Sequence, residues 1–143
     1  MGVYKISLMD AYLIETLRRN GINNKEILSE LKAGNVEKWQ SLHESFDFHE
    51  LLKLANKDFE QFREIINHGY QVKFITFNGL KNLLRIRFNK KPDKDYVLQE
   101  KGIQNLVLNQ KELQSVKQML SKNWVLEEVK EGKCNKVNIQ SVS

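Results

Sequence analysis

The sequence predicts an α+β protein: a helical N-terminal half (a helix-turn-helix-like bundle) packed on a small mixed α/β C-terminal half. Up to Gly69, apolar residues recur at helical spacing between turn residues. Val72–Phe77 then changes to β-branched and aromatic residues, which favour a strand. After Lys130 too few apolar residues remain to pack. We therefore expect a helical subdomain at 1–69, a basic α/β subdomain at 70–130 that shares a core with it, and a flexible tail at 131–143.

The first two helices are predicted from their end signals. Ser7 precedes an apolar stripe as an N-cap, and Asp10 in the first turn resembles the acid of a capping box. Asn20-Gly21 ends this helix, and Asn23 or Asn24 caps a second, shorter one. The predicted buried faces contain Leu8, Tyr12, Leu13, Leu17, Ile27, Leu28 and Leu31.

Lys25–Leu42 has part of the pattern of a DNA-binding helix-turn-helix. A turn at 33–35 separates the second helix from a third over 36–42, and the anchors would be Ile27, Leu31, Val36 and Trp39. The spacing across the turn is about two residues shorter than the common form. The element that would enter the DNA groove also carries two acids, Glu37 and Glu44, against one cation, Lys38, and the acids would repel phosphates. We interpret the segment mainly as a structural bundle that helps to position the protein on DNA, with Lys38 as a candidate phosphate contact.

Two more helices complete the N-terminal half. Phe46-Asp47-Phe48 interrupts the helical pattern, and Asp47 is then available as the cap of a helix over 49–57. Lys57-Asp58 begins the next helix, and His68-Gly69 ends it, with glycine just after the last helical residue.

The segment after Asn78-Gly79 has two readings. Asn-Gly is a strong hairpin signal, and the alternation over 83–88 fits a strand. A helix capped by Thr76 or Asn78 also fits, and the adjacent Leu83 and Leu84 favour it because they break a clean alternation. We predict the helix and keep the hairpin as the alternative.

The remaining elements follow from turn and cap residues. Strands are predicted at 96–98 and 106–108, on either side of a Lys101-Gly102 turn. Asn109 caps a further helix, and Trp124–Val129 forms a short closing strand.

The composition is that of a cytoplasmic protein. The single cysteine, Cys134, excludes an internal disulfide and fits a reducing compartment. No apolar run approaches the roughly 20 residues of a membrane span. The first residues do not have the shape of a signal peptide.

Positive charge is concentrated in the second half of the chain. Residues 1–69 hold nine Lys/Arg and eleven Asp/Glu, whereas residues 70–143 hold fourteen and seven. Such asymmetry favours a polyanionic partner. The alternative is that the cations form a solvated surface that keeps the protein soluble and binds no partner. The candidate nucleic-acid-binding residues are Lys73, Lys81, Arg85, Arg87, Lys90, Lys91 and Lys94, together with Lys38.

No residue pattern predicts catalysis or a metal site. His43, Asp47 and His49 lie near one another in sequence, but they lack the spacing of a known metal motif and are expected at the surface or as caps. Cys134 has no predicted base beside it. We expect a protein without enzymatic activity, cofactor or metal.

These observations predict a small regulatory protein that binds DNA through the basic residues. The alternative is an adaptor or inhibitor whose basic face meets an acidic protein partner. Neither function involves a membrane, and homodimerisation is left open.

Overall fold

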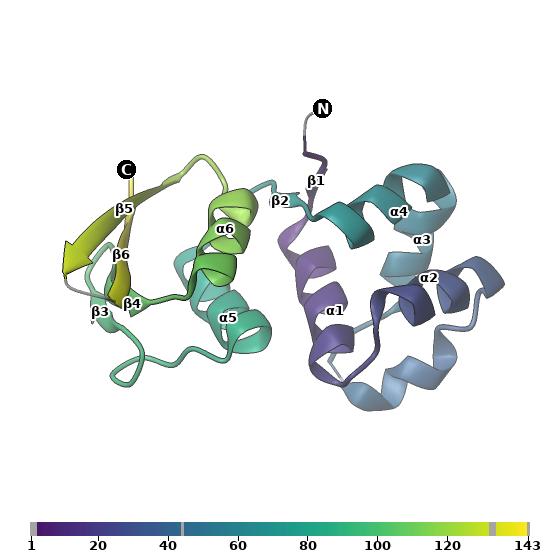
Figure 1. Cartoon of the computed structure of the whole chain (residues 1–143). Helices are drawn as coiled ribbons and strands as arrows, with labels where there is room; N and C mark the ends of the chain where they lie inside the picture. The colour runs from purple at the N-terminus through teal and green to yellow at the C-terminus, as the bar shows by residue number, and fades with distance from the viewer. Residues whose placement is uncertain (1–2, 44, 132–133, 143) are drawn as a thin grey trace.

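The computed structural model describes residues 3–43, 45–131 and 134–142 and shows the predicted α+β fold, with helices first and most strands last. Figure 1 shows α1–α4 on one side and α5, α6 and the sheet of β3–β6 on the other. The elements are β1 (Lys5–Ile6), α1 (Leu8–Arg19), α2 (Asn24–Ala33), η1 (Glu37–Leu42), α3 (His49–Lys57), α4 (Phe59–His68), β2 (Gln71–Val72), α5 (Phe77–Phe88), β3 (Val97–Gln99), β4 (Gly102–Val107), α6 (Gln110–Met119), β5 (Trp124–Glu131) and β6 (Cys134–Ser141).

Most helix starts are at the predicted caps. The side chains of Ser7, Asn23 and Asp58 each accept a hydrogen bond from the backbone N–H three residues later, at 2.8–3.1 Å. Asn109 forms a full capping box with Glu112 at the start of α6. The cap predicted for α3 is wrong by one residue: Phe48 is the N-cap, and Asp47 instead accepts a bond from the N–H of His49.

The predicted third helix is a 3₁₀ helix, η1, rather than an α-helix. Val36 and Trp39 are both buried, and the N–H of Trp39 donates to the carbonyl of Val36 at 3.0 Å. In a 3₁₀ helix side chains three residues apart lie one above the other, so this spacing places both in the core.

The strand predicted at Val72–Phe77 is mostly wrong. Only Gln71–Val72 is a strand, paired in parallel with β1, and Thr76 already caps α5. Between them, the backbone of Ile75 bonds to side chains of residues 121–124 instead of to a strand. The helix predicted after it is confirmed as α5, and the hairpin alternative is wrong. Gly79 lies inside α5, where Leu8 packs so closely that an added Cβ would lie 2.6 Å from its Cδ2.

The C-terminal sheet is antiparallel, in the order β3-β4-β6-β5. Residues 134–141, expected in a flexible tail, form β6 between β4 and β5. Val137 and Ile139 alternate with polar residues along β6, and both are buried. Two apolar side chains are enough to hold this strand in the sheet because β4 and β5 pair with it on both sides. Residues 132–133 and 143, also assigned to the tail, lie outside the described residues.

One apolar core connects the two halves. The buried cluster runs from α1 and the other N-terminal helices through α5 to residues of α6 and the sheet. α1 and α5 pack against each other, side by side near the middle of Figure 1. Trp39 and Trp124 are both buried in this core. None of the helices in the described residues is long and apolar enough to cross a bilayer.

Candidate nucleic-acid interface

The C-terminal ends of α1 and α5 meet, and this contact organises the basic surface. The guanidinium of Arg19 donates from Nη1 to the carbonyl oxygen of Arg85 at 2.9 Å. That carbonyl belongs to the last turn of α5, where the helix dipole favours a cation. Asn89 then ends α5 in the left-handed conformation, with φ of 57°, and turns the chain into the loop at 89–95.

A groove of about 690 Å³ opens beside this contact, lined by residues of α1, α4, α5 and α6. Its cationic lining residues are Arg18, Arg19, Arg87 and Lys111, and its acidic ones are Glu15 and Glu112.

The floor of the groove is a buried charge network around Glu15, which is 2% exposed. Glu15 Oε2 accepts a hydrogen bond from Tyr70 Oη at 2.6 Å and from Arg18 Nη1 at 2.9 Å. Arg87 Nε lies 3.5 Å from the same oxygen, and its guanidinium lies 5.2 Å from the ring centroid of Tyr70. Arg18 also donates to the carbonyl of Ile66 at 2.8 Å, which connects α1 to α4.

Tyr70 stays protonated in this network. Burial raises the pKa of its hydroxyl well above the ordinary value of 10.0, and the charge of Glu15 raises it further. The opposing charge of Arg87 is a smaller influence on this pKa. The phenol is therefore a fixed hydrogen-bond donor to Glu15.

Three of the eight predicted phosphate contacts are in ion pairs with the protein's own acids. Arg87 is held by Glu15, with its side chain only 13% exposed. Lys90 Nζ lies 3.5 Å from Glu112 Oε1, and Lys38 Nζ lies 3.4 Å from Glu30 Oε2. These cations neutralise the protein's own acids.

Two others lie away from the groove. Lys73 follows β2, where its backbone N–H donates to the carbonyl of Ile6. Lys81 is on α5, with Nζ 5.4 Å from the ring centroid of Phe77. Neither residue lines the groove described above.

The remaining three, Arg85, Lys91 and Lys94, are exposed and continue from the end of α5 into the 89–95 loop. The ion pair between Lys90 and Glu112 holds this loop beside the start of α6. The sequence interpretation missed Arg19 and Lys111, which the fold brings to the same end of the molecule. We call the set the basic rim, and it consists of Arg19, Arg85, Lys91, Lys94 and Lys111.

All five side chains of the basic rim are exposed, and none is in an ion pair with any described residue. Two acids beside the rim, Asp95 and Glu112, are already engaged. Asp95 accepts the backbone N–H of Lys91 at 2.8 Å, and Glu112 pairs with Lys90 and caps α6. Asp93 is exposed in the same loop. The rim therefore keeps an excess of positive charge toward solvent.

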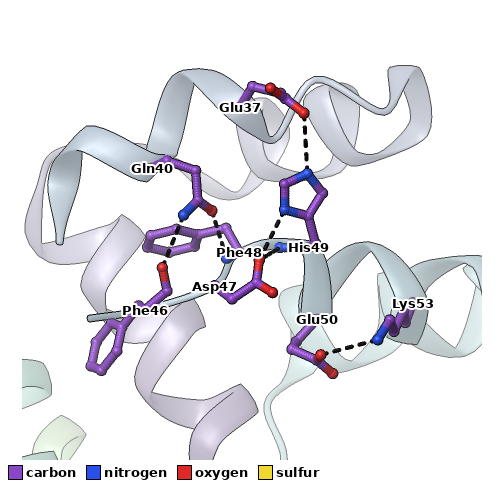
Figure 2. Close-up of polar contacts among 8 residues, drawn as sticks. All are labelled: Glu37, Gln40, Phe46, Asp47, Phe48, His49, Glu50 and Lys53. Carbon is purple, nitrogen blue, oxygen red and sulfur yellow. Dashed lines mark hydrogen bonds and ion pairs between the residues drawn. The ribbon is translucent and has the colours of Figure 1, made fainter. Parts of the chain in front are cut away.

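The helix-turn-helix segment and the neighbouring His49 belong to a separate polar cluster (Figure 2). His49 Nδ1 lies 2.9 Å from Asp47 Oδ1, and His49 Nε2 lies 3.2 Å from Glu37 Oε1. Gln40 bridges the same turn, donating to the carbonyl of Phe46 and accepting from the N–H of Phe48. No group of three potential metal ligands is found among the described residues. The cluster fastens η1 to α3.

Comparison of the chain with protein-family models, curated proteins and solved structures gave no match.

Proposed function

We propose that this protein is a non-enzymatic DNA-binding protein that holds the phosphate backbone with the basic rim. The observation that supports this proposal is a set of five exposed cations, none in an ion pair with a described residue, at the adjoining ends of α1, α5 and α6 and in the 89–95 loop. Lysine and arginine bind phosphates without reading sequence and release condensed counterions as they do so.

The helix-turn-helix segment has no proposed role in reading bases. η1 has six residues, begins with Glu37 and has Lys38 paired to Glu30. A short 3₁₀ helix that begins with an acid is poorly suited to a major groove lined by phosphates. The expected binding is therefore weakly sequence-dependent.

The test is fluorescence anisotropy of a labelled duplex at about 50 and 200 mM salt, with the full chain. If about four rim cations each neutralise one phosphate, affinity should fall about a hundredfold across this range. Arg19→Glu with Arg85→Glu should abolish binding at the lower salt concentration.

The matched control is Lys32→Glu with Lys57→Glu, which changes the net charge equally at exposed positions of α2 and α3. This control should retain most of the affinity. No binding of the wild-type chain at low salt, or equal loss in the two double variants, would contradict a role for the rim. Circular dichroism of each variant would verify that the fold is kept.

A further inference from the structure

A second surface feature lies where β2 leads into α5, away from the basic rim. Phe74 is 60% exposed, the most exposed large apolar side chain among the described residues. It stands at the edge of a pocket of about 670 Å³ whose other apolar walls are Ile75, Phe77 and Trp124. An exposed aromatic beside an apolar pocket is typical of a protein-binding site.

Hydrogen bonds fix the backbone that presents Phe74. The N–H of Ile75 donates to Ser121 Oγ at 3.0 Å, and its carbonyl accepts from Asn123 Nδ2 at 2.9 Å and from Trp124 Nε1 at 2.7 Å. Ser121 Oγ in turn donates to Asn123 Oδ1. This network explains why 73–76 leaves the strand conformation.

The pocket walls are also held by ring packing. Phe77 and Trp124 meet edge-to-face, with ring centroids 5.8 Å apart and planes at 68°. A preformed pocket with ordered walls loses less conformational entropy on binding a partner than a mobile loop does.

Lysines are frequent in the segments that line the pocket. Lys101 lines it, Lys73 and Lys122 adjoin the lining residues Phe74 and Asn123, and Lys81 Nζ lies 5.4 Å from the ring centroid of Phe77. The acids nearby are fewer: Glu100 lines the pocket, and Asp10 interacts with Lys73. The segments that form the pocket therefore carry more lysines than acids.

We propose that this pocket docks an acidic peptide segment of another protein. A bulky apolar side chain of the partner would enter the pocket against Phe74 and Trp124, and flanking carboxylates would face Lys73 and Lys101. A second copy of this chain fits less well, because a twofold contact would place the same lysines against each other. The inference does not depend on DNA binding by the basic rim.

The test begins with selection from a random dodecamer peptide library on the immobilised full chain. We expect enriched peptides that carry an aromatic or large aliphatic residue flanked by Asp or Glu. The enriched peptide, labelled, then serves as the probe for anisotropy measurements. Backbone amide chemical shifts on peptide addition should change at 73–77, 100–101 and 121–124.

Phe74→Ser should weaken binding of the selected peptide at least tenfold, and so should Lys73→Glu with Lys101→Glu. Val107→Ser, which changes an exposed valine at the far end of β4, is the control and should bind as the wild type does. Peptides enriched without acids, binding unchanged in Phe74→Ser, or no enrichment would each overturn the proposal. Concentration-dependent dimerisation that Phe74→Ser abolishes would overturn it in favour of a second copy.

The two proposed sites are separable. Phe74→Ser should leave DNA affinity unchanged, and Arg19→Glu with Arg85→Glu should leave peptide affinity unchanged. Failure of one assay therefore says nothing against the other site.

Discussion

At the scale of single residues, Glu15 is the buried carboxylate on which the groove depends. A single carboxylate oxygen, Oε2, accepts hydrogen bonds from Arg18 and Tyr70 and lies close to the guanidinium of Arg87. These three residues come from α1, the α4–β2 connection and α5, respectively. Removing the charge leaves two cations without their counterion, one of them almost buried. Loss of one partner of such a pair costs more than the pair itself contributes to stability.

We therefore predict that Glu15→Gln lowers the free energy of unfolding by roughly 2–4 kcal/mol, below the full range for deeply buried pairs because Arg18 is partly exposed. Urea unfolding followed by circular dichroism measures this change. Glu50→Gln is the control, since its pair with Lys53 is exposed at the surface, and it should change stability by less than about 0.5 kcal/mol. Equal effects of the two variants would show that the Glu15 network is not structural.

His49 provides a second prediction at this scale, concerning pH. Hydrogen bonds to Asp47 and then Glu37 raise the pKa of its imidazole above the ordinary value of 6.5. The protonated form is thus favoured in the folded state. Its contribution to stability is complete below pH 6.5 and is lost as the pH rises through the raised pKa.

Asp47→Asn should move the pKa of His49 back toward 6.5, because the first and largest cause is removed. Titration of the His49 ring protons by NMR measures this shift. Glu37→Gln should have the same sign and a smaller size. An unchanged titration in Asp47→Asn would show that the contacts in Figure 2 do not persist in solution.

At the scale of elements, local signals were sufficient wherever a side chain caps its own helix. Ser7, Asn23, Asp58 and Asn109 each act within three residues, so the sequence contains both partners of the bond. The 73–76 segment shows the opposite case. Its β-branched and aromatic residues favour a strand, but its bonding partners are the side chains at 121–124, which no local pattern connects to it.

At the scale of elements we make a prediction for Gly102, where the backbone of β6 leaves no room for a side chain on β4. A Cβ here would lie 2.2 Å from the carbonyl oxygen of Ile139 and 2.9 Å from the Cα of Gln140. Both are backbone atoms of the neighbouring strand and cannot rotate away. Gly102→Ala should therefore cost about 2–3 kcal/mol of stability through overpacking.

Gly34→Ala is the control that separates a clash with neighbouring backbone from the strain of placing alanine at a positive φ. Gly34 has φ of 78° with nothing within 4 Å of an added Cβ, so only backbone strain of about 1 kcal/mol is expected. Thermal unfolding of both variants gives the comparison. A Gly102→Ala protein as stable as the wild type would show that the backbone of β6 lies farther from Gly102 than the 2.2 Å contact of an added Cβ implies.

At the scale of the whole molecule, the fold class was predictable and the functional surface only partly so. Lys91, Lys94 and Arg85 are local in sequence and lie on the basic rim. Arg19 and Lys111 were missed because α1 belongs to a half with a net negative charge and α6 starts well after the basic segment. Arg87 was predicted as a phosphate contact because a sequence does not show which cations will meet a buried acid.

The last residues of the chain give the strongest test of the whole fold. A composition poor in apolar residues predicted a flexible tail, yet β6 is hydrogen-bonded to both β4 and β5. Burial of Val137 and Ile139 contributes about 1.5–3 kcal/mol each, a large part of the 5–15 kcal/mol typical of a domain. Without β6, β5 would also lose its only strand neighbour in the described sheet.

We predict that a chain ending after residue 131 loses the cooperative thermal transition of the C-terminal half and aggregates, because the core face of α5 and α6 is uncovered. A chain ending after residue 141 is the control. Among the hydrogen bonds of the described residues, it removes the one from the N–H of Val142 to the carbonyl of Asn123, and it should unfold within a few degrees of the full chain. Calorimetry of both distinguishes a structural strand from a tail. If the shorter chain kept the melting temperature of the longer one, β6 would not be part of the cooperative fold.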